Sequence, residues 1–177
     1  KASIVIGARY DSYELKPSVD ELFNRSNVAR NALSYIDDSA VSGKLGFIYD
    51  INDSLSIFAQ YAEGFRSPDY ESANISFTNF AFFYSVAPNP NLDSEESDGY
   101  EIGLRGNNNF GESRINWSLV YYENDYEDFI DTQITGRTQR GITIYQYVNL
   151  NNVTIDGFEL EVQALSLIHI SEPTRLR

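Results

Sequence analysis

Few side chains in this chain could carry out acid–base or nucleophilic chemistry. Among its 177 residues none is cysteine and a single one, His169, is histidine. Without cysteine there is no disulfide, thiolate zinc site or thiol nucleophile, and a catalytic triad has almost no candidate base. Glu159 and Glu161 share one face of an alternating segment like paired carboxylates, and we expect them to pair with basic residues or to line water. The sequence therefore predicts no catalytic residue and no enzyme.

Two acidic clusters could offer the oxygen ligands that Ca²⁺ prefers. They lie at Asn124–Asp128 and Ile36–Asp38. Neither has the Asp-x-Asp-x-Asp-Gly spacing of a calcium loop, so we predict solvated acidic loops and no metal site. The acidity is general, because 26 Asp and Glu oppose 13 Lys and Arg, for a net charge of -13. Phosphates need basic residues to neutralise them, and we therefore exclude nucleic acid as a partner.

The last residues differ in character from the rest. From Leu165 the chain reads Leu-Ser-Leu-Ile-His-Ile-Ser-Glu-Pro-Thr-Arg, which resembles one reading frame of a common sequencing-library adaptor. We interpret residues 165–177 as a non-native tail and residues 1–164 as the native segment, which we expect to continue on both sides. The alternative is a genuine amphipathic tail. Without residues 165–177 the chain has no histidine at all.

The elements that must position any site are strands. Six segments alternate apolar and polar side chains with a period of two residues, as a strand with two different faces does. These segments are Ser3–Asp11, Lys44–Ile51, Leu55–Phe65, Tyr100–Gly106, Ile115–Asn124 and Gly157–Ala164. No run of 18 apolar residues is present, which excludes a transmembrane helix. We predict an all-β, antiparallel fold.

The connections between these segments alternate between short and long. Tight turns are predicted at Asn52-Asp53 and within Gly106–Glu112, and long polar connections at Glu14–Ser42, Ser67–Asp98 and Asp131–Tyr145. Short turns at one end and long loops at the other are typical of outer-membrane barrels. Six strands are too few to close around a useful lumen, since such barrels have at least about eight. We therefore predict a fragment of a larger transmembrane β-barrel.

The two faces of the predicted strands suit lipid and water respectively. The apolar faces carry no Lys or Arg, and Glu63 is their main exception. The charged residues of the other face are Arg9, Lys44, Glu101, Arg105, Glu159 and Glu161. A Lys or Arg facing the middle of a bilayer would cost about 2–4 kcal/mol, and Tyr and Trp toward the strand ends fit an aromatic girdle. Two alternatives remain, a passive porin-like barrel and a soluble β-sandwich that binds carbohydrate through tyrosines.

Two short sequence boxes flank the second long connection. The first is Glu63-Gly64-Phe65-Arg66-Ser67-Pro68, and the second is the Asn-Pro-Asn-Leu run of Asn89–Leu92, followed by Gly99–Gly106 with its Glu, Gly, Leu and Arg. The pair resembles the TonB-dependent outer-membrane receptors, especially the haem and haemoglobin (haemoglobin–transferrin–lactoferrin) branch. That branch has a Phe-Arg-Ala-Pro box, in which Ser67 replaces the alanine here.

The resemblance implies a 22-strand barrel with an N-terminal plug domain in the outer membrane of a Gram-negative bacterium. It implies TonB as an energy-supplying partner through that plug. The expected function is import of an iron source, with haem or a haem- or iron-carrying protein as the cargo, and haem is then a transported ligand and not a cofactor. The alternative within the same family is a receptor for a siderophore or another nutrient.

The ligand-binding residues that the resemblance implies come from the two boxes and the connection between them. They are Phe65, Arg66, Pro68, Tyr70, Tyr84, Asn89, Pro90, Asn91 and Leu92. Haem receptors of this branch usually place a histidine in this connection, but Asp69–Ala87 has none. Tyr70 or Tyr84 could ligate haem iron instead, with phenylalanine rings stacked on the porphyrin. Alternatively these aromatic residues pack the loop on itself or on the barrel rim, which we favour, while Arg66 anchors the loop through backbone carbonyls.

Overall fold

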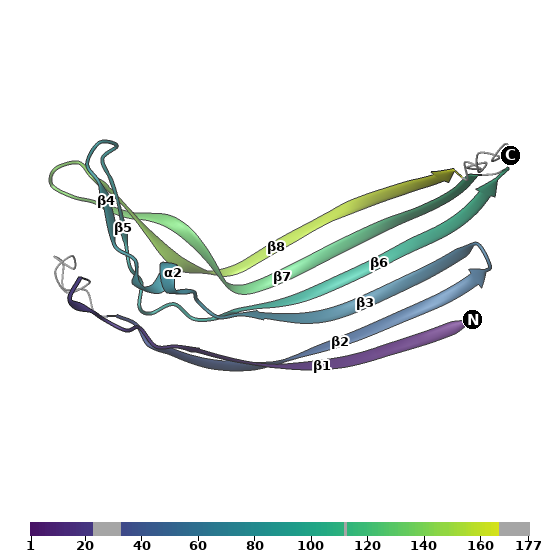
Figure 1. Ribbon diagram of the computed structural model, residues 1–177, viewed down its shortest axis with the longest axis horizontal. Coiled ribbons are helices and arrows are strands. Elements are labelled where there is room, and N and C mark those ends of the chain that lie inside the picture. Colours follow the sequence, from purple (N-terminus) through teal and green to yellow (C-terminus); the bar gives the residue numbers. More distant parts are fainter. Residues whose placement is uncertain (23–32, 112, 167–177) are drawn as a thin grey trace, which may run out of the picture.

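The chain forms one open, curved sheet. The computed structural model describes residues 1–22, 33–111 and 113–166, and within them eight strands are joined in the order β1-β2-β3-β6-β7-β8-β5-β4. The six long strands are β1 (Ala2–Leu15), β2 (Ile36–Asn52), β3 (Leu55–Arg66), β6 (Glu95–Phe110), β7 (Ser113–Arg137) and β8 (Thr143–Ser166). Figure 1 shows them side by side, with the start of β1 and the end of β8 on the same side as the tight turns.

The predicted antiparallel fold is confirmed for all six long strands, which pair with their neighbours in antiparallel register. Two short strands, β4 (Phe77–Asn79) and β5 (Tyr84–Ala87), add to the predicted six. Together with the helix α2 (Tyr70–Asn74) they lie in the connection from β3 to β6. No helix in the described parts of the chain is long and apolar enough to cross a membrane.

The long connections are shorter than predicted, because the strands continue past the point where their apolar alternation ends. β1 reaches Leu15 and β2 already begins at Ile36. The predicted loop at Asp131–Tyr145 is mostly the end of a β7–β8 hairpin, whose register runs to Arg137 opposite Thr143. The acidic cluster Asn124–Asp128 likewise lies within β7 and not in a loop. Backbone pairing needs no apolar side chain, so a polar sequence can extend a hairpin that its neighbours have started.

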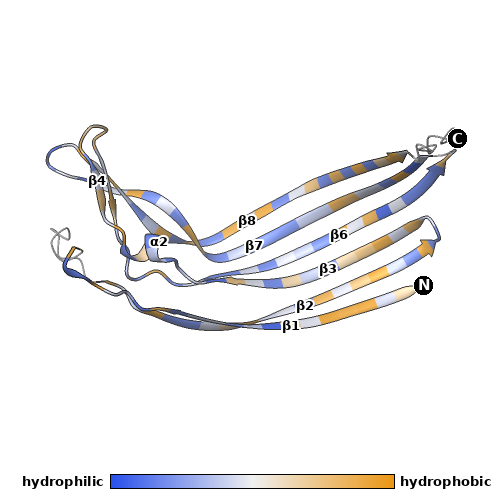
Figure 2. Ribbon diagram, viewed as in Figure 1, coloured by the Kyte–Doolittle hydropathy of each residue, from blue (hydrophilic) through white to orange (hydrophobic). Residues whose placement is uncertain are grey.

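The apolar faces of the six long strands are aligned with one another. One row of cross-strand partners reads Ile4, Phe47, Ala59, Ile102, Tyr121 and Phe158. The neighbouring row toward the tight turns is Ala2, Tyr49, Ile57, Leu104, Leu119 and Leu160. We call these two rows and their apolar neighbours the apolar band. Eight of the twelve residues in these two rows are exposed, among them Ile4 at 67% and Phe158 at 76%. The other four, Ile57, Ala59, Leu104 and Tyr121, are half-buried. Figure 2 shows the apolar residues gathered in the parts of the strands near the turns.

The opposite face carries the charged residues that the sequence placed there, and it is tightly interlocked. Glu101 pairs with Gln60 and Tyr122, and Arg105 pairs with Ser56 and Ser118. Gly103 lies under the ring of Phe58, where an added Cβ would come within 2.5 Å of Phe58 Cζ. Glycine at this position therefore permits close packing of the Phe58 ring.

The proposed boundary of the non-native tail falls at the end of β8. Leu165 and Ser166 still pair with Arg114 and Ser113 of β7. Residues 167–177 lie outside the described residues, so the interpretation of residues 165–177 as a tail stays a prediction.

Candidate functional site

The first box ends β3 and anchors the connection that follows. Arg66 Nη2 donates to Glu95 Oε2 at 2.7 Å, which joins the last residue of β3 to the first residue of β6. Our expectation that Arg66 would bind backbone carbonyls is therefore wrong: its partner is a carboxylate. Glu95 is 7% exposed, and the same oxygen accepts the Ile130 backbone N–H at 3.1 Å. Phe65 is half-buried at the end of β3, and Pro68 is fully buried.

The helix α2 holds the next part of the connection in place. Asp69 caps it, because Asp69 Oδ1 accepts the Ser72 backbone N–H at 2.8 Å. This hydrogen bond holds the pKa of Asp69 below its usual value. Ser72, Ala73 and Asn74 are buried. Tyr70, on the first turn, remains 41% exposed.

The second box ties the connection to β8. Asn89 Nδ2 donates to the Tyr147 carbonyl oxygen at 2.9 Å, and Asn89 Oδ1 accepts the Asn91 backbone N–H at 3.1 Å. The Asn89 backbone N–H reaches the Ser72 carbonyl oxygen at 3.4 Å. Pro90 and Asn91 are exposed and Leu92 is half-buried. The first asparagine of the box thus serves as a link between α2 and β8.

Two further residues complete this network, and the sequence alone did not indicate them. Asn149 on β8 binds both sides of the backbone of Asp93: its Oδ1 accepts the Asp93 N–H at 2.9 Å, and its Nδ2 donates to the Asp93 carbonyl at 3.0 Å. Asn74 Oδ1 accepts the Ser34 backbone N–H at 2.5 Å, which connects the loop base to the residues just before β2. We call this network, from Arg66 to α2 and from Asn89 to Glu95, the loop base.

The two tyrosines considered as iron ligands lie on different elements. Tyr70 is on α2, in the loop base, whereas Tyr84 begins β5. The Tyr84 ring contacts Phe77 at a centroid distance of 6.1 Å and Tyr145 of β8 at 6.2 Å. Phe77 and Tyr84 therefore pack on each other and on β8, as the interpretation that we favoured requires. Phe80, Phe82 and Phe83 do not follow it, since they are 72%, 79% and 60% exposed.

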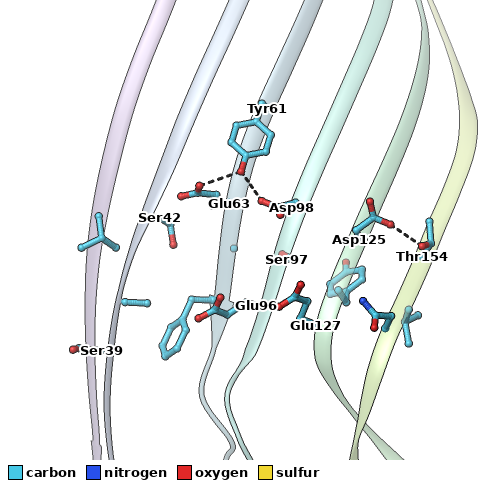
Figure 3. A pocket seen from close by; sticks show the side chains of 17 residues that line it. Ser39, Ser42, Tyr61, Glu63, Glu96, Ser97, Asp98, Asp125, Glu127 and Thr154 are labelled. Carbon is cyan, nitrogen blue, oxygen red and sulfur yellow. Dashed lines mark hydrogen bonds between the residues drawn. The ribbon is translucent and has the colours of Figure 1, made fainter.

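A second, acidic region lies where the apolar band ends. Tyr61 donates to Asp98 Oδ1 at 2.5 Å and also contacts Glu63 Oε1 at 3.0 Å, and Thr154 donates to Asp125 Oδ1 at 2.6 Å. Figure 3 shows these side chains around a shallow hollow of about 640 Å³. Within the described residues no group of three or more acidic or histidine side chains is placed to hold a metal ion.

Comparison with known proteins places the fold in a family. Residues 1–170 match the family described as "TonB dependent receptor-like, beta-barrel". The chain therefore belongs to the TonB-dependent receptor family, a family of receptors and transporters, and its sheet is part of that family's barrel.

Individual relatives include receptors for two kinds of iron source. The chain is 29% identical over 92% of its length to the hemoglobin and hemoglobin-haptoglobin-binding protein A of Haemophilus influenzae. It is 28% identical over 67% of its length to the ferripyoverdine receptor of Pseudomonas aeruginosa. These alignments cover 16% and 13% of the relatives, so the chain spans less than a fifth of the length of these two relatives.

A solved structure shows the same fold. The hemophore receptor HasR of Serratia marcescens, in complex with its hemophore HasA and heme, superposes with a TM-score of 0.66 at 18% identity. The match covers 93% of this chain and 28% of HasR. At this identity the likeness supports the arrangement of strands alone.

Proposed function

We propose that this chain forms part of the barrel wall of an outer-membrane, TonB-dependent receptor that imports an iron source, either haem or a haem- or iron-carrying protein. The observation that carries the proposal is the apolar band, which runs in register across six strands and is mostly exposed. In water such a surface would aggregate, whereas lipid solvates it. The opposite, charged face then lines a wet lumen.

The open edges of the sheet support a larger barrel. Among the described residues β1 pairs only with β2, and β8 beyond Gln146 pairs only with β7. In lipid each unpaired backbone group costs several kcal/mol, so a transmembrane sheet has to close. Additional strands would supply that closure, and a plug domain would supply the contact with TonB.

Haem is the first cargo to test, because hemoglobin-binding relatives match the chain over most of its length. The experiment deletes the receptor gene in a strain without other iron-uptake systems and restores it on a plasmid. Growth on haem or haemoglobin as the sole iron source should require the gene and should be lost again when TonB is deleted. Growth that is independent of the gene on every iron source would refute the proposal.

A siderophore receptor is the second candidate. The ferripyoverdine receptor is among the relatives, and Asp69–Ala87 contains no histidine to bind haem iron. The same strain distinguishes the two cargoes, since a siderophore receptor would restore growth on a ferric siderophore and not on haem.

A further inference from the structure

The pairing between β2 and β3 ends before either strand does. Their register runs from the tight turn only as far as Lys44 opposite Ala62. Beyond this pair β2 stays with β1 over residues 36–43, and β3 stays with β6 over residues 63–66. Figure 1 shows the β1–β2 pair separating from β3 at a distance from the tight turns. We call these two facing edges, which are not paired with each other, the split.

A carboxylate side chain ends the ladder where the split begins. Continued register would place Gly43 opposite Glu63, and the Gly43 N–H would then bind the backbone of its partner. This N–H instead donates to the side-chain oxygen Glu63 Oε2 at 2.7 Å. The Tyr61 hydroxyl contacts Glu63 Oε1 at 3.0 Å and Asp98 Oδ1 at 2.5 Å. Figure 3 shows Tyr61 between the two carboxylates, so the tyrosine holds the Glu63 side chain in its place.

Beyond the split, β2 is attached to the loop base. Ser94 Oγ donates to Asp38 Oδ2, and the Ser34 backbone N–H donates to Asn74 Oδ1 at 2.5 Å. Asp38 Oδ1 also accepts the Ser39 backbone N–H at 2.8 Å. Over this stretch the contacts of β2 on the side away from β1 are thus with the loop base.

Both edges of the split already have the conformation and register of a longer ladder. Continuing the register would place Val41 opposite Phe65. Every second residue of a strand presents its N–H and C=O to the same neighbour, so Val41 faces β3 as Gly43 does. Val41 is 68% exposed, and the hollow of about 640 Å³ is lined by Val41 and Phe65 among others. Closing the split therefore needs a swing of a formed hairpin and no new strand.

The open and closed arrangements exchange similar sets of hydrogen bonds. Closing would lose the bond from Gly43 to the Glu63 side chain and the bond between Asp38 and Ser94. It would gain backbone bonds at Gly43 and Val41. Because the net contribution of one hydrogen bond to stability is small, an exchange of nearly equal numbers leaves the two arrangements close in free energy.

We propose that the split is a two-state element of the receptor wall. In one state β2 is held by the loop base, as in the structure, and the Glu63 side chain ends the ladder. In the other state the β2–β3 ladder extends to Val41 and Phe65. The loop base and the wall compete for β2, so a change that loosens the loop base favours the closed ladder, and the closed ladder in turn releases Ser94. The inference concerns the wall and is independent of the cargo's identity.

The test measures disulfide formation in the complete receptor in outer-membrane vesicles with a membrane-permeable oxidant. The sensor pair is Val41→Cys with Phe65→Cys, which are brought together by the closed ladder. The reference pair is Phe47→Cys with Ala59→Cys, which are register partners in the structure. An even number of residues separates the two pairs along each strand, so both occupy the same type of pairing site. The chain has no cysteine of its own, cysteines elsewhere in the receptor are changed to serine, and heat-modifiable migration on gels verifies folding.

We expect the sensor pair to cross-link more slowly than the reference pair, at a rate that follows the closed population. Glu63→Ala should raise this rate about 3–10-fold, as loss of an exposed charged hydrogen bond from the open state does. Ser94→Ala releases Asp38 and should act in the same direction, about 2–5-fold. Glu63→Gln keeps an acceptor for the Gly43 N–H, and Glu96→Ala removes an exposed carboxylate from the same face of β6. Both controls should stay within about two-fold of the wild type.

Hydrogen exchange gives a second readout that needs no cysteine. The Val41 N–H gains an acceptor only when the ladder closes, so its protection should rise in Glu63→Ala and stay unchanged in Glu96→Ala.

Two results would overturn the proposal. If the sensor pair never cross-links in any variant while the reference pair does, the split does not close. If the sensor pair cross-links as fast as the reference pair in every variant, the ladder is always closed and the loop base does not compete for β2. Neither result bears on the proposed function, which the growth experiment tests separately.

Discussion

In the wall formed by the six long strands, side chains such as Ile4 and Phe158 stay 67% and 76% exposed, whereas at the loop base Ala73 is 1% exposed and Pro68 is buried completely. In the wall, each long strand pairs through its backbone with the long strand before or after it in the chain. The surroundings of the protein cover the apolar side chains of the wall. The loop base is a small core of its own, made of hydrogen bonds between residues that lie 29 to 58 positions apart in the sequence. The wall and the loop base are therefore stabilised in different ways, and they meet where the lipid-facing part of the strands gives way to the loops.

The sharpest way to break this comparison is to place a charge in the apolar band. Ile102→Arg should destabilise the folded barrel by about 2–4 kcal/mol, because Ile102 lies in the middle row of the band. Its neighbour Glu101 points to the charged face, so Glu101→Arg is the matched control and should change stability little. Urea unfolding of the receptor in lipid vesicles measures both. Equal losses in the two variants would show that the band does not face lipid.

The corresponding test at the loop base removes a carboxylate. Glu95→Ala leaves Arg66 and the Ile130 N–H without their acceptor, and we expect local opening to become easier by about 1.5–3 kcal/mol. We expect a free-energy change near the lower end of this range, since Arg66 is 59% exposed and solvent weakens its ion pair with Glu95. Hydrogen exchange of residues 67–94 measures the opening.

Glu96→Ala is the control for that variant, because Glu96 is exposed and adjacent. Faster exchange confined to Glu95→Ala would locate the anchor at the loop base. Unchanged protection in both variants would mean that the base is held by other contacts.

A third test concerns packing on the charged face of the wall. In Gly103→Ala the new Cβ would lie 2.5 Å from Phe58 Cζ and 2.9 Å from the Leu119 carbonyl oxygen. Overpacking of this kind costs about 1–3 kcal/mol. Gly46→Ala should be nearly neutral, since its nearest atom, Val5 Cβ, is 3.6 Å away. Urea midpoints of the two variants compare them, and a neutral Gly103→Ala would show that Phe58 moves aside freely.

The same two regions differ in how far the sequence predicts them. The period-two alternation predicts the six strands and both of their faces, because alternate side chains along a strand face lipid and water. Lipid favours apolar side chains on one face, and water favours polar side chains on the other. The strand ends were missed at Asn124–Asp128 and Asp131–Tyr145, where both faces are polar and alternation disappears.

At the loop base the sequence identified the boxes but not their partners. Arg66 and Asn89 were singled out by resemblance, yet Glu95 and Asn149 carry no local pattern that marks them. Their roles depend on contacts between segments distant in sequence, which spacing alone does not reveal. For Glu95, its position three residues after the second box was an available signal: an acid opposite the arginine at the end of the preceding strand.

The smallest expected effect concerns the helix cap of the loop base, and pH gives it a distinctive sign. The Ser72 N–H holds the pKa of Asp69 below its usual value, so the folded form binds this proton less readily than the unfolded form. The cap therefore stabilises α2 fully above the unfolded pKa of about 3.9 and loses this contribution as the pH falls through the folded value. Asp69→Ala should weaken protection of Ala73 and Asn74 by about 1 kcal/mol near neutral pH. Asp69→Asn keeps an acceptor without the charge and should show less change between pH 6 and pH 3 than the wild type, after correction for intrinsic exchange rates. If the wild type and Asp69→Asn respond to pH alike, the carboxylate charge has no part in seating the helix.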